Sequence, residues 1–125
     1  MNIYNGQKIL VVEDNFMSFK LIEVHFKRSN LGVVHATDGL MALEKFREED
    51  DIRAVLMDIQ LPGINGLEVT REIRKMDSDV PVIATTGNVF EDDRLACMDA
   101  GCNYFLEKPL DFNVLNDIFE KHLNA

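Results

Sequence analysis

Short apolar runs alternate along the whole chain with longer segments of helical period. The runs are rich in β-branched residues and are apolar on both faces, which is typical of strands buried in a parallel sheet. Because each run is only four to six residues long, it fits a strand better than a buried helix. The five predicted strands are Lys8–Glu13, Val33–Ala36, Ala54–Met57, Val80–Thr85 and Tyr104–Glu107.

Apolar residues recur every three or four positions between these strands, as they do on one face of a helix. In the first such segment Phe19, Ile22 and Phe26 have this spacing, and Phe16 extends the expected buried face by one turn. Residues that can cap a helix stand before several of the segments. The cap candidates are Asp14, Asp38, Asn65 and Asp111. The buried faces of the four later helices are predicted from Ala42, Leu43 and Phe46, from Leu67, Val69, Ile73 and Met76, from Leu95, Ala96 and Met98, and from Leu110, Val114, Leu115, Ile118, Phe119 and Leu123.

This alternation predicts an α/β fold, a doubly wound parallel sheet of five strands with helices on both faces. At 125 residues the chain is too short for two ordinary domains. The helical pattern continues to Leu123, and no linker or low-complexity stretch interrupts the chain. We therefore expect a single domain over residues 1–125 with no output domain.

Composition narrows the classes of function. Thirteen basic residues against 22 acidic ones give a net charge of −9, which argues against binding to nucleic acids or to anionic membranes. The apolar run Ile9–Val12 is too short for a signal peptide or a membrane span. Cys97 and Cys102 form neither a disulfide framework nor a metal-ligand spacing, so we expect two small buried thiols in a reducing compartment. These features predict a cytoplasmic protein.

Ionisable and hydroxyl side chains stand at the ends of four predicted strands. In an open α/β sheet, functional residues gather at the carboxyl ends of the strands. Glu13 and Asp14 lie at the end of the first strand, Asp58 after the third, Thr86 after the fourth and Lys108 after the fifth. We expect these side chains to share one edge of the sheet.

The combination predicts chemistry at a phosphoryl group. Two like charges 4 Å apart repel by about 4 kcal/mol at an effective dielectric constant near 20, so clustered carboxylates either raise the pKa of one carboxyl or take a divalent cation. An all-oxygen ligand set suits Mg²⁺ better than zinc. With a lysine and a hydroxyl to bind phosphoryl oxygens, Asp58 is the expected nucleophile. Taken singly, Asp14 could instead cap a helix, Lys108 could be a surface lysine and Thr86 a turn hydroxyl.

Four spaced motifs resemble the receiver (response-regulator) domain family of two-component signalling, over essentially the whole chain from Ile9 to Leu123. The resemblance implies a (βα)₅ flavodoxin-like fold with strand order 2-1-3-4-5. The motifs are Leu10–Asn15 (LVVEDN), Leu56–Gly66 (LMDIQLPGING), Pro81–Thr86 (PVIATT) and Lys108–Pro109.

The resemblance also implies a metal site and a phosphodonor. Asp58 would be phosphorylated from a phosphohistidine on a sensor histidine kinase or a histidine phosphotransfer protein. The metal would be Mg²⁺ (or Mn²⁺), held by Asp14, Asp58 and the backbone carbonyl of Gln60, with Glu13 close by through water.

A conformational switch is implied as well. Thr86 would be the switch hydroxyl, Phe105 the aromatic residue that moves inward with it, and Lys108 the contact to the phosphoryl group. A cis peptide bond between Lys108 and Pro109 would turn the lysine back over the strand ends. Signalling would use the face of the fourth helix, the fifth strand and the fifth helix, in a monomer or a phosphorylation-dependent dimer.

The chain departs from the common pattern of the family at two positions. Phe105 stands where many members carry Tyr, so a phenolic hydrogen bond to a partner is lost. Gly87 stands where Ala is frequent, which makes the adjoining loop more permissive in backbone angle. Gln60 and Asn88 are the side chains expected to tune access of water to phosphorylated Asp58, unless they are plain loop residues.

Three other interpretations stay open. The chain could be a receiver domain excised from a hybrid sensor kinase or a larger regulator, although Met1 and the polar leader at residues 2–7 favour a free-standing protein. An aspartate-nucleophile phosphatase would usually carry a second acid at the position of Gln60, which cannot transfer a proton. A flavin binder on the same fold would have its phosphate repelled by Glu13 and Asp14. His25, His35 and His122 have no partners at ligand spacing and are expected to be surface or strand residues.

Overall fold

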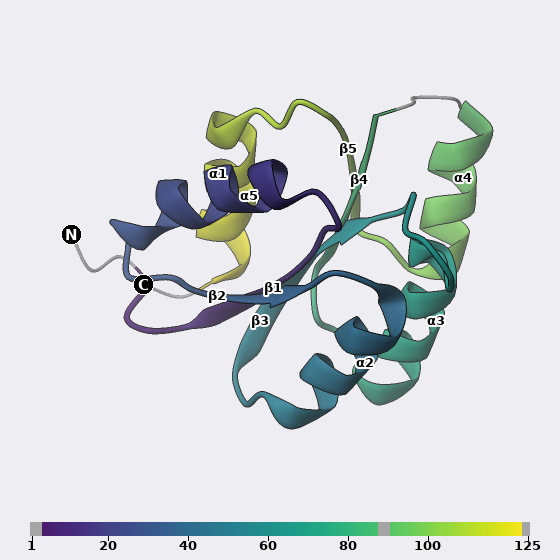
Figure 1. Ribbon diagram of the computed structural model, residues 1–125, viewed down its shortest axis with the longest axis horizontal. Helices are drawn as coiled ribbons and strands as arrows, with labels where there is room; N and C mark the ends of the chain where they lie inside the picture. Colours follow the sequence, from purple (N-terminus) through teal and green to yellow (C-terminus); the bar gives the residue numbers. More distant parts are fainter. Residues whose placement is uncertain (1–3, 88–90, 124–125) are drawn as a thin grey trace.

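Five parallel strands alternate with five helices in the computed structural model, which describes residues 4–87 and 91–123 (Figure 1). The strand order β2-β1-β3-β4-β5 confirms the predicted doubly wound topology. No helix in the described part of the chain is long and apolar enough to cross a membrane. The elements are β1 (Lys8–Val12), α1 (Phe16–Lys27), β2 (Gly32–Ala36), α2 (Gly39–Glu48), β3 (Ile52–Asp58), α3 (Gly66–Met76), β4 (Val82–Thr86), α4 (Glu91–Ala100), β5 (Tyr104–Glu107) and α5 (Phe112–His122).

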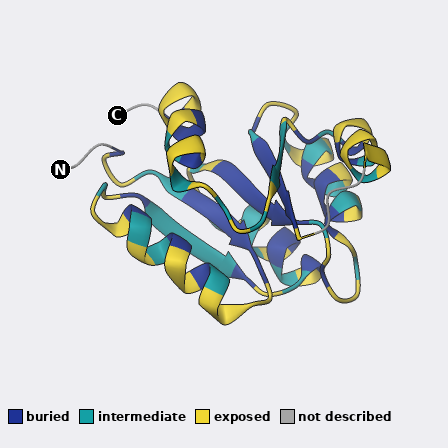
Figure 2. Ribbon diagram, turned by 90° about the horizontal axis from the view of Figure 1, so that it is seen from above, coloured by how far each residue is buried: buried dark blue, intermediate teal, exposed yellow. Residues whose placement is uncertain are grey.

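The sheet separates two hydrophobic cores. Helices α1 and α5 cover one face, and α2, α3 and α4 cover the other (Figure 1). Successive residues of each central strand point into opposite cores, as Leu10 and Val11 do, because side chains alternate along a strand. The central strands β1, β3 and β4 are therefore largely buried on both faces, while the outer faces of the helices are exposed (Figure 2). The strand ends are left as the place where polar side chains can meet.

Helix starts follow the predicted caps with one exception. Asp38, Asn65 and Asp111 each accept hydrogen bonds from backbone amides of the first turn that follows. The capping alternative for Asp14 is wrong, because Asn15 Oδ1 accepts the bond from the amide of Ser18, at 3.0 Å. The Asp14 carboxylate is thereby left for another role.

The buried face of α1 is one turn shorter than the sequence predicts. Phe16 is 64% exposed, whereas Phe19, Ile22 and Phe26 are buried as expected. Since α1 begins at Phe16, that residue lies at the rim of the sheet and Phe19 is the first to reach the core. The fifth helix begins at Phe112, so Leu110 belongs to the preceding loop.

Both cysteines are buried, free thiols, as predicted. Burial raises the pKa of Cys97 to about 12 and also raises the pKa of Cys102. Thiolates are the reactive species, so neither residue has the character of a nucleophile.

Candidate functional site

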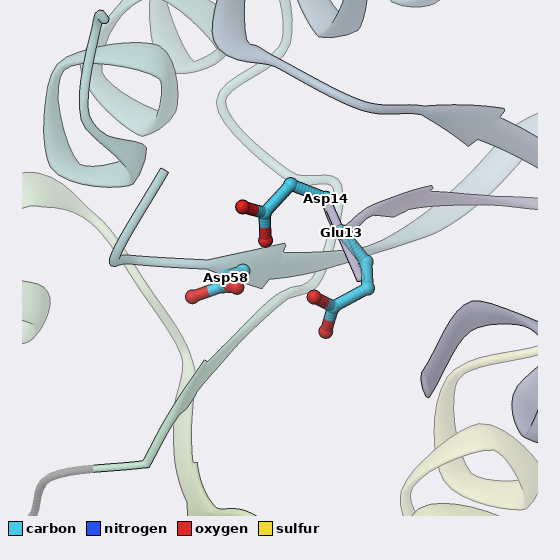
Figure 3. A group of neighbouring side chains, drawn as sticks. All are labelled: Glu13, Asp14 and Asp58. Carbon is cyan, nitrogen blue, oxygen red and sulfur yellow. The ribbon is translucent and has the colours of Figure 1, made fainter. Parts of the chain in front are cut away.

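Three carboxylates gather where β1 and β3 end (Figure 3). Asp58 is the last residue of β3, and Glu13 and Asp14 directly follow β1, whose last residue Val12 is in register with Met57. One carboxylate oxygen from each of the three lies within 4.8 Å of the others. Glu13 and Asp58 are buried while Asp14 is exposed, so the cluster is open to solvent on one side only.

Lys108 joins the two buried acids. Its Nζ lies 2.7 Å from Glu13 Oε1 and 3.0 Å from Asp58 Oδ2. Burial lowers the pKa of the Lys108 ammonium, but its bonds to Glu13 and Asp58 outweigh that effect and the pKa is raised. The lysine is therefore charged at neutral pH and offsets part of the repulsion between the two carboxylates.

The backbone places Lys108 at this edge. Its amide donates to the carbonyl of Thr86 at 2.7 Å, which extends the pairing of β4 with β5 by one residue. The peptide bond between Lys108 and Pro109 is cis, the geometry expected from the sequence.

Glu13 is held at both carboxylate oxygens. Oε1 contacts Lys108, and Oε2 accepts a hydrogen bond from the amide of Asn15 at 3.0 Å. Burial raises the pKa of the Glu13 carboxyl, and the nearby charge of Asp58 raises it further, against the lowering effect of Lys108 and the Asn15 amide.

Asp58 is oriented by the turn that follows it. Its Oδ1 accepts a hydrogen bond from the amide of Gln60 at 2.8 Å, and its Oδ2 faces Lys108. Helix α3 begins against this turn, since a Cβ on Gly66 would lie 2.5 Å from the carbonyl oxygen of Asp58. Only glycine permits this approach. The role of the Gln60 carbonyl as a metal ligand stays a prediction.

Thr86 and Phe105 lie on the neighbouring strands. Thr86 is the last residue of β4 and is fully buried. Phe105, on β5, is half-buried and packs against the core beneath α2, α3 and α4, whereas Tyr104 packs on the opposite face, as expected for adjacent residues of a strand. Thr86 and Phe105 therefore lie on the two strands beyond β3, and their role as a switch stays a prediction.

The side chain of Gln60 joins the loops that follow β3 and β4. Its Oε1 accepts a hydrogen bond from the amide of Gly87 at 3.4 Å. This long bond links the β3–α3 turn to the end of β4. The control of water access by Gln60 stays a prediction. Asn88, the other candidate for that role, lies outside the described residues.

His35 contacts the site although no pattern in the sequence predicts it there. Its Nε2 lies 2.8 Å from the backbone carbonyl oxygen of Glu13. Because the two residues are 22 positions apart, no spacing rule for ligands points to this contact.

The donor set fits a hard divalent cation. The cluster offers carboxylate oxygens without Cys or His, and Glu13, Asp14, Asp58 and Lys108 together carry a formal charge of −2. Mg²⁺ is commonly bound through one or two carboxylates with several waters retained, and the exposed side of Asp14 leaves room for them. The residues present therefore fit the Mg²⁺ site expected from the sequence.

Comparisons with known proteins agree with this geometry. Residues 9–120 match the model of the response regulator receiver domain. The chain is 34% identical over 122 residues to hybrid signal transduction histidine kinase L of Dictyostelium discoideum, covering 92% of this chain and 7% of that protein. The chain spans a quarter or less of the curated relatives first compared.

Two solved structures carry the comparison further. The receiver domain of sensor histidine kinase PA1611 from Pseudomonas aeruginosa PAO1, with a magnesium ion coordinated in its active site cleft, is 36% identical with a TM-score of 0.84, covering 94% of this chain and 97% of that chain. The receiver domain of the Saccharomyces cerevisiae response regulator Ssk1, solved with the histidine phosphotransfer protein Ypd1, has a TM-score of 0.85 at 23% identity, covering 93% of this chain and 88% of that chain, a likeness of fold alone. With the family model matched over most of its length and the acidic cluster at the carboxyl edge of the sheet, this chain belongs to the response regulator receiver domain family.

Proposed function

We propose that this receiver domain accepts a phosphoryl group on Asp58 from a phosphohistidine of a sensor histidine kinase or a histidine phosphotransfer protein. The observation that carries the proposal is the position of Asp58, in a cluster of three carboxylates and 3.0 Å from the ammonium of Lys108. The magnesium ion in the PA1611 receiver domain, which is 36% identical to this chain, supports the same assignment.

The residues have distinct parts in the transfer. A carboxylate oxygen of Asp58 forms the new O–P bond while the P–N bond of the phosphohistidine breaks, and the imidazole keeps the electron pair of that bond. Lys108, already 3.0 Å from Asp58 Oδ2, is placed to bind an oxygen of the transferred group. A bound Mg²⁺ would neutralise charge on the phosphoryl oxygens. Gln60, two residues after Asp58, cannot act as a general base, which disfavours the phosphatase alternative.

The donor is expected to dock over α1. Helix α1 exposes a row of large apolar residues, of which Leu21 is 61% exposed. Leu21 also lines a cavity of about 110 Å³, whose wall includes Glu13 and Lys108. A donor that brings a phosphohistidine to Asp58 must cover the surface around this cavity. A large exposed apolar patch such as that on α1 is typical of a protein interface. The apolar row consists of Phe16, Met17, Leu21 and Val24.

A downstream protein would recognise the phosphorylated state at another surface. We propose that phosphorylation repositions Thr86 and Phe105 and thereby changes the face formed by α4, β5 and α5, where a downstream protein binds. The domain would act in the cytoplasm, without nucleic acid or membrane contact, as a monomer or as a dimer formed on phosphorylation. Because the relatives include a hybrid kinase, a place within such a kinase is as compatible as a free-standing regulator.

Phosphorylation by a small donor tests the central claim. Incubation with acetyl phosphate and Mg²⁺ should add one phosphoryl group to the wild-type protein, as measured by intact-mass spectrometry, and none to Asp58→Asn. Asp79→Asn is a matched control, because Asp79 is an exposed acid at the other end of the strands, and it should label as the wild type does. Equal labelling of Asp58→Asn would overturn the assignment.

A further inference from the structure

His35 reaches from β2 to the end of the neighbouring strand β1. It is in register with Val11, two residues before Glu13, and its Nε2 lies 2.8 Å from the Glu13 carbonyl oxygen. Since a carbonyl oxygen only accepts hydrogen bonds, Nε2 must carry the hydrogen and donate it. The bond therefore requires that Nε2 of His35 carries a hydrogen.

Packing fixes the orientation of the His35 ring. It stacks on Phe19 with the ring centroids 3.6 Å apart and the planes 3° from parallel. Phe19 is 7% exposed and belongs to the core beneath α1 and α5. Because the partner ring is itself held in the core, the imidazole is preorganised to donate toward Glu13.

The carbonyl that accepts this bond belongs to the peptide that joins two of the three acids. The amide of Glu13 donates to Ala36, at 3.0 Å, and β2 ends there, so the side chain of His35 supplies a donor beyond the end of the backbone pairing. Because a peptide unit is planar, a bond to the Glu13 oxygen fixes the direction in which the chain enters Asp14. The same bond opposes the repulsion that drives the Asp14 carboxylate away from Glu13 and Asp58.

We infer that His35 is a positioning residue of the divalent-cation site, which holds the Glu13–Asp14 peptide so that the Asp14 carboxylate faces Asp58. The inference rests on the proposed function, because it takes the acidic cluster to be a Mg²⁺ site. His35 contacts no expected metal-binding oxygen and acts only through the backbone. Its loss should therefore weaken Mg²⁺ binding without abolishing it.

Calorimetric titration of the full chain with Mg²⁺ at one fixed pH tests this role. His35→Phe keeps a ring to stack on Phe19 but removes the N–H donor, and should raise the Mg²⁺ dissociation constant about three- to tenfold, the range for one lost hydrogen bond. His25→Phe is the matched control. His25 also stacks on an aromatic ring, that of Phe112, and its Nε2 lies 3.1 Å from Asn116 Oδ1, between α1 and α5. It should lose a comparable bond without any change in Mg²⁺ affinity.

A second pair of variants separates the hydrogen bond from the ring. Glutamine can donate from a position close to Nε2, whereas methionine has similar length and no donor, so His35→Gln should bind Mg²⁺ at least about threefold more tightly than His35→Met. Equal affinity in this pair, or a wild-type affinity in His35→Phe, overturns the role of His35 and leaves the proposed function intact. Failure of the wild-type protein to bind Mg²⁺ overturns both.

Discussion

The ammonium of Lys108 lies 3.0 Å from Oδ2 of Asp58, a residue 50 positions earlier in the chain. The same ammonium contacts Glu13, so one cation links two carboxylates that are almost entirely buried. Such an arrangement is costly to leave incomplete, because a buried charge without its partner retains its desolvation penalty. The site thus depends on Lys108 for stability as well as for the proposed phosphoryl transfer.

Lys108→Met should show the effect of Lys108 on fold stability separately from its effect on phosphorylation. Without Mg²⁺ the variant should lose about 2–4 kcal/mol of unfolding free energy in urea, because removal of one partner leaves both acids uncompensated and Lys108 itself is partly exposed. Mg²⁺ should bind more tightly, since the site gains a negative charge, while labelling by acetyl phosphate falls. Lys121→Met, at an exposed position of α5, should change stability by less than about 0.5 kcal/mol. Unchanged stability of Lys108→Met would contradict the linking role.

Asp14→Asn should make the protein without metal more stable. The substitution removes one charge from a cluster in which like charges lie within 4.8 Å, a repulsion of about 1 kcal/mol per pair for an exposed group. No cap is lost, because Asn15 caps α1. Thermal unfolding without Mg²⁺ should show a higher midpoint, and the rise in midpoint that Mg²⁺ gives to the wild type should largely disappear.

Asp117→Asn, which removes an exposed charge from α5, is the control for the change in net charge. It should retain the full Mg²⁺-dependent rise in midpoint. A lower midpoint for metal-free Asp14→Asn than for wild type would show that Asp14 stabilises the fold rather than strains it.

Glu13 should make stability depend on pH. Burial raises the pKa of its carboxyl above the ordinary value of 4.5, so the folded state binds a proton more tightly than the unfolded state does. The stability that this group contributes is fully present below about pH 4.5 and is lost as the pH rises through the folded-state pKa.

Urea unfolding without Mg²⁺ at a series of pH values tests this linkage. The unfolding free energy of the wild type minus that of Glu13→Gln should decrease as the pH rises above 4.5. The difference isolates Glu13 from the other acids, which titrate in both proteins. A difference that increases with pH would mean that Lys108 and the Asn15 amide dominate over burial.

Much of this fold and site could be predicted because the sequence features that indicate them involve residues close together in the chain. Each strand is an apolar run and each acid directly follows one, so the alternation of strands and helices places Glu13, Asp58 and Lys108 at one edge. The same reasoning failed for Phe16, since α1 has apolar residues on two faces and a sequence does not say which of them meets the sheet.

The contacts proposed to tune the site are not local. The bond from His35 to the Glu13 carbonyl depends on the register of β1 with β2 and on the position of the Phe19 ring. The link from Gln60 to Gly87 depends on how two loops approach each other across β3 and β4. Neither arrangement leaves a spacing or a composition that can be recognised in the chain before it is folded.

The buried hydroxyl of Thr86 should couple phosphorylation to the output face. A phosphoryl group on Asp58 presents oxygens that seek donors, and Thr86 ends the strand next to Asp58. Movement of this side chain would change the space available to Phe105, whose strand neighbour is Ala84. One hydrogen bond contributes about 1–3 kcal/mol, enough to shift two states of similar energy but not to rebuild the fold.

Amide chemical shifts with beryllofluoride, a mimic of the phosphoryl group, can measure this coupling. In the wild type, beryllofluoride and Mg²⁺ should shift the amides of α4 and β5, whereas in Thr86→Ala those shifts should largely vanish while the amides beside Asp58 still respond. Thr85→Ala is the matched control, because Thr85 is also a buried threonine of β4 but its side chain points to the opposite face of the strand. It should keep the full response. If Thr86→Ala shifts the amides of α4 and β5 as the wild type does, the coupling does not pass through this hydroxyl, and the bond between Gln60 and Gly87 becomes the route to test next.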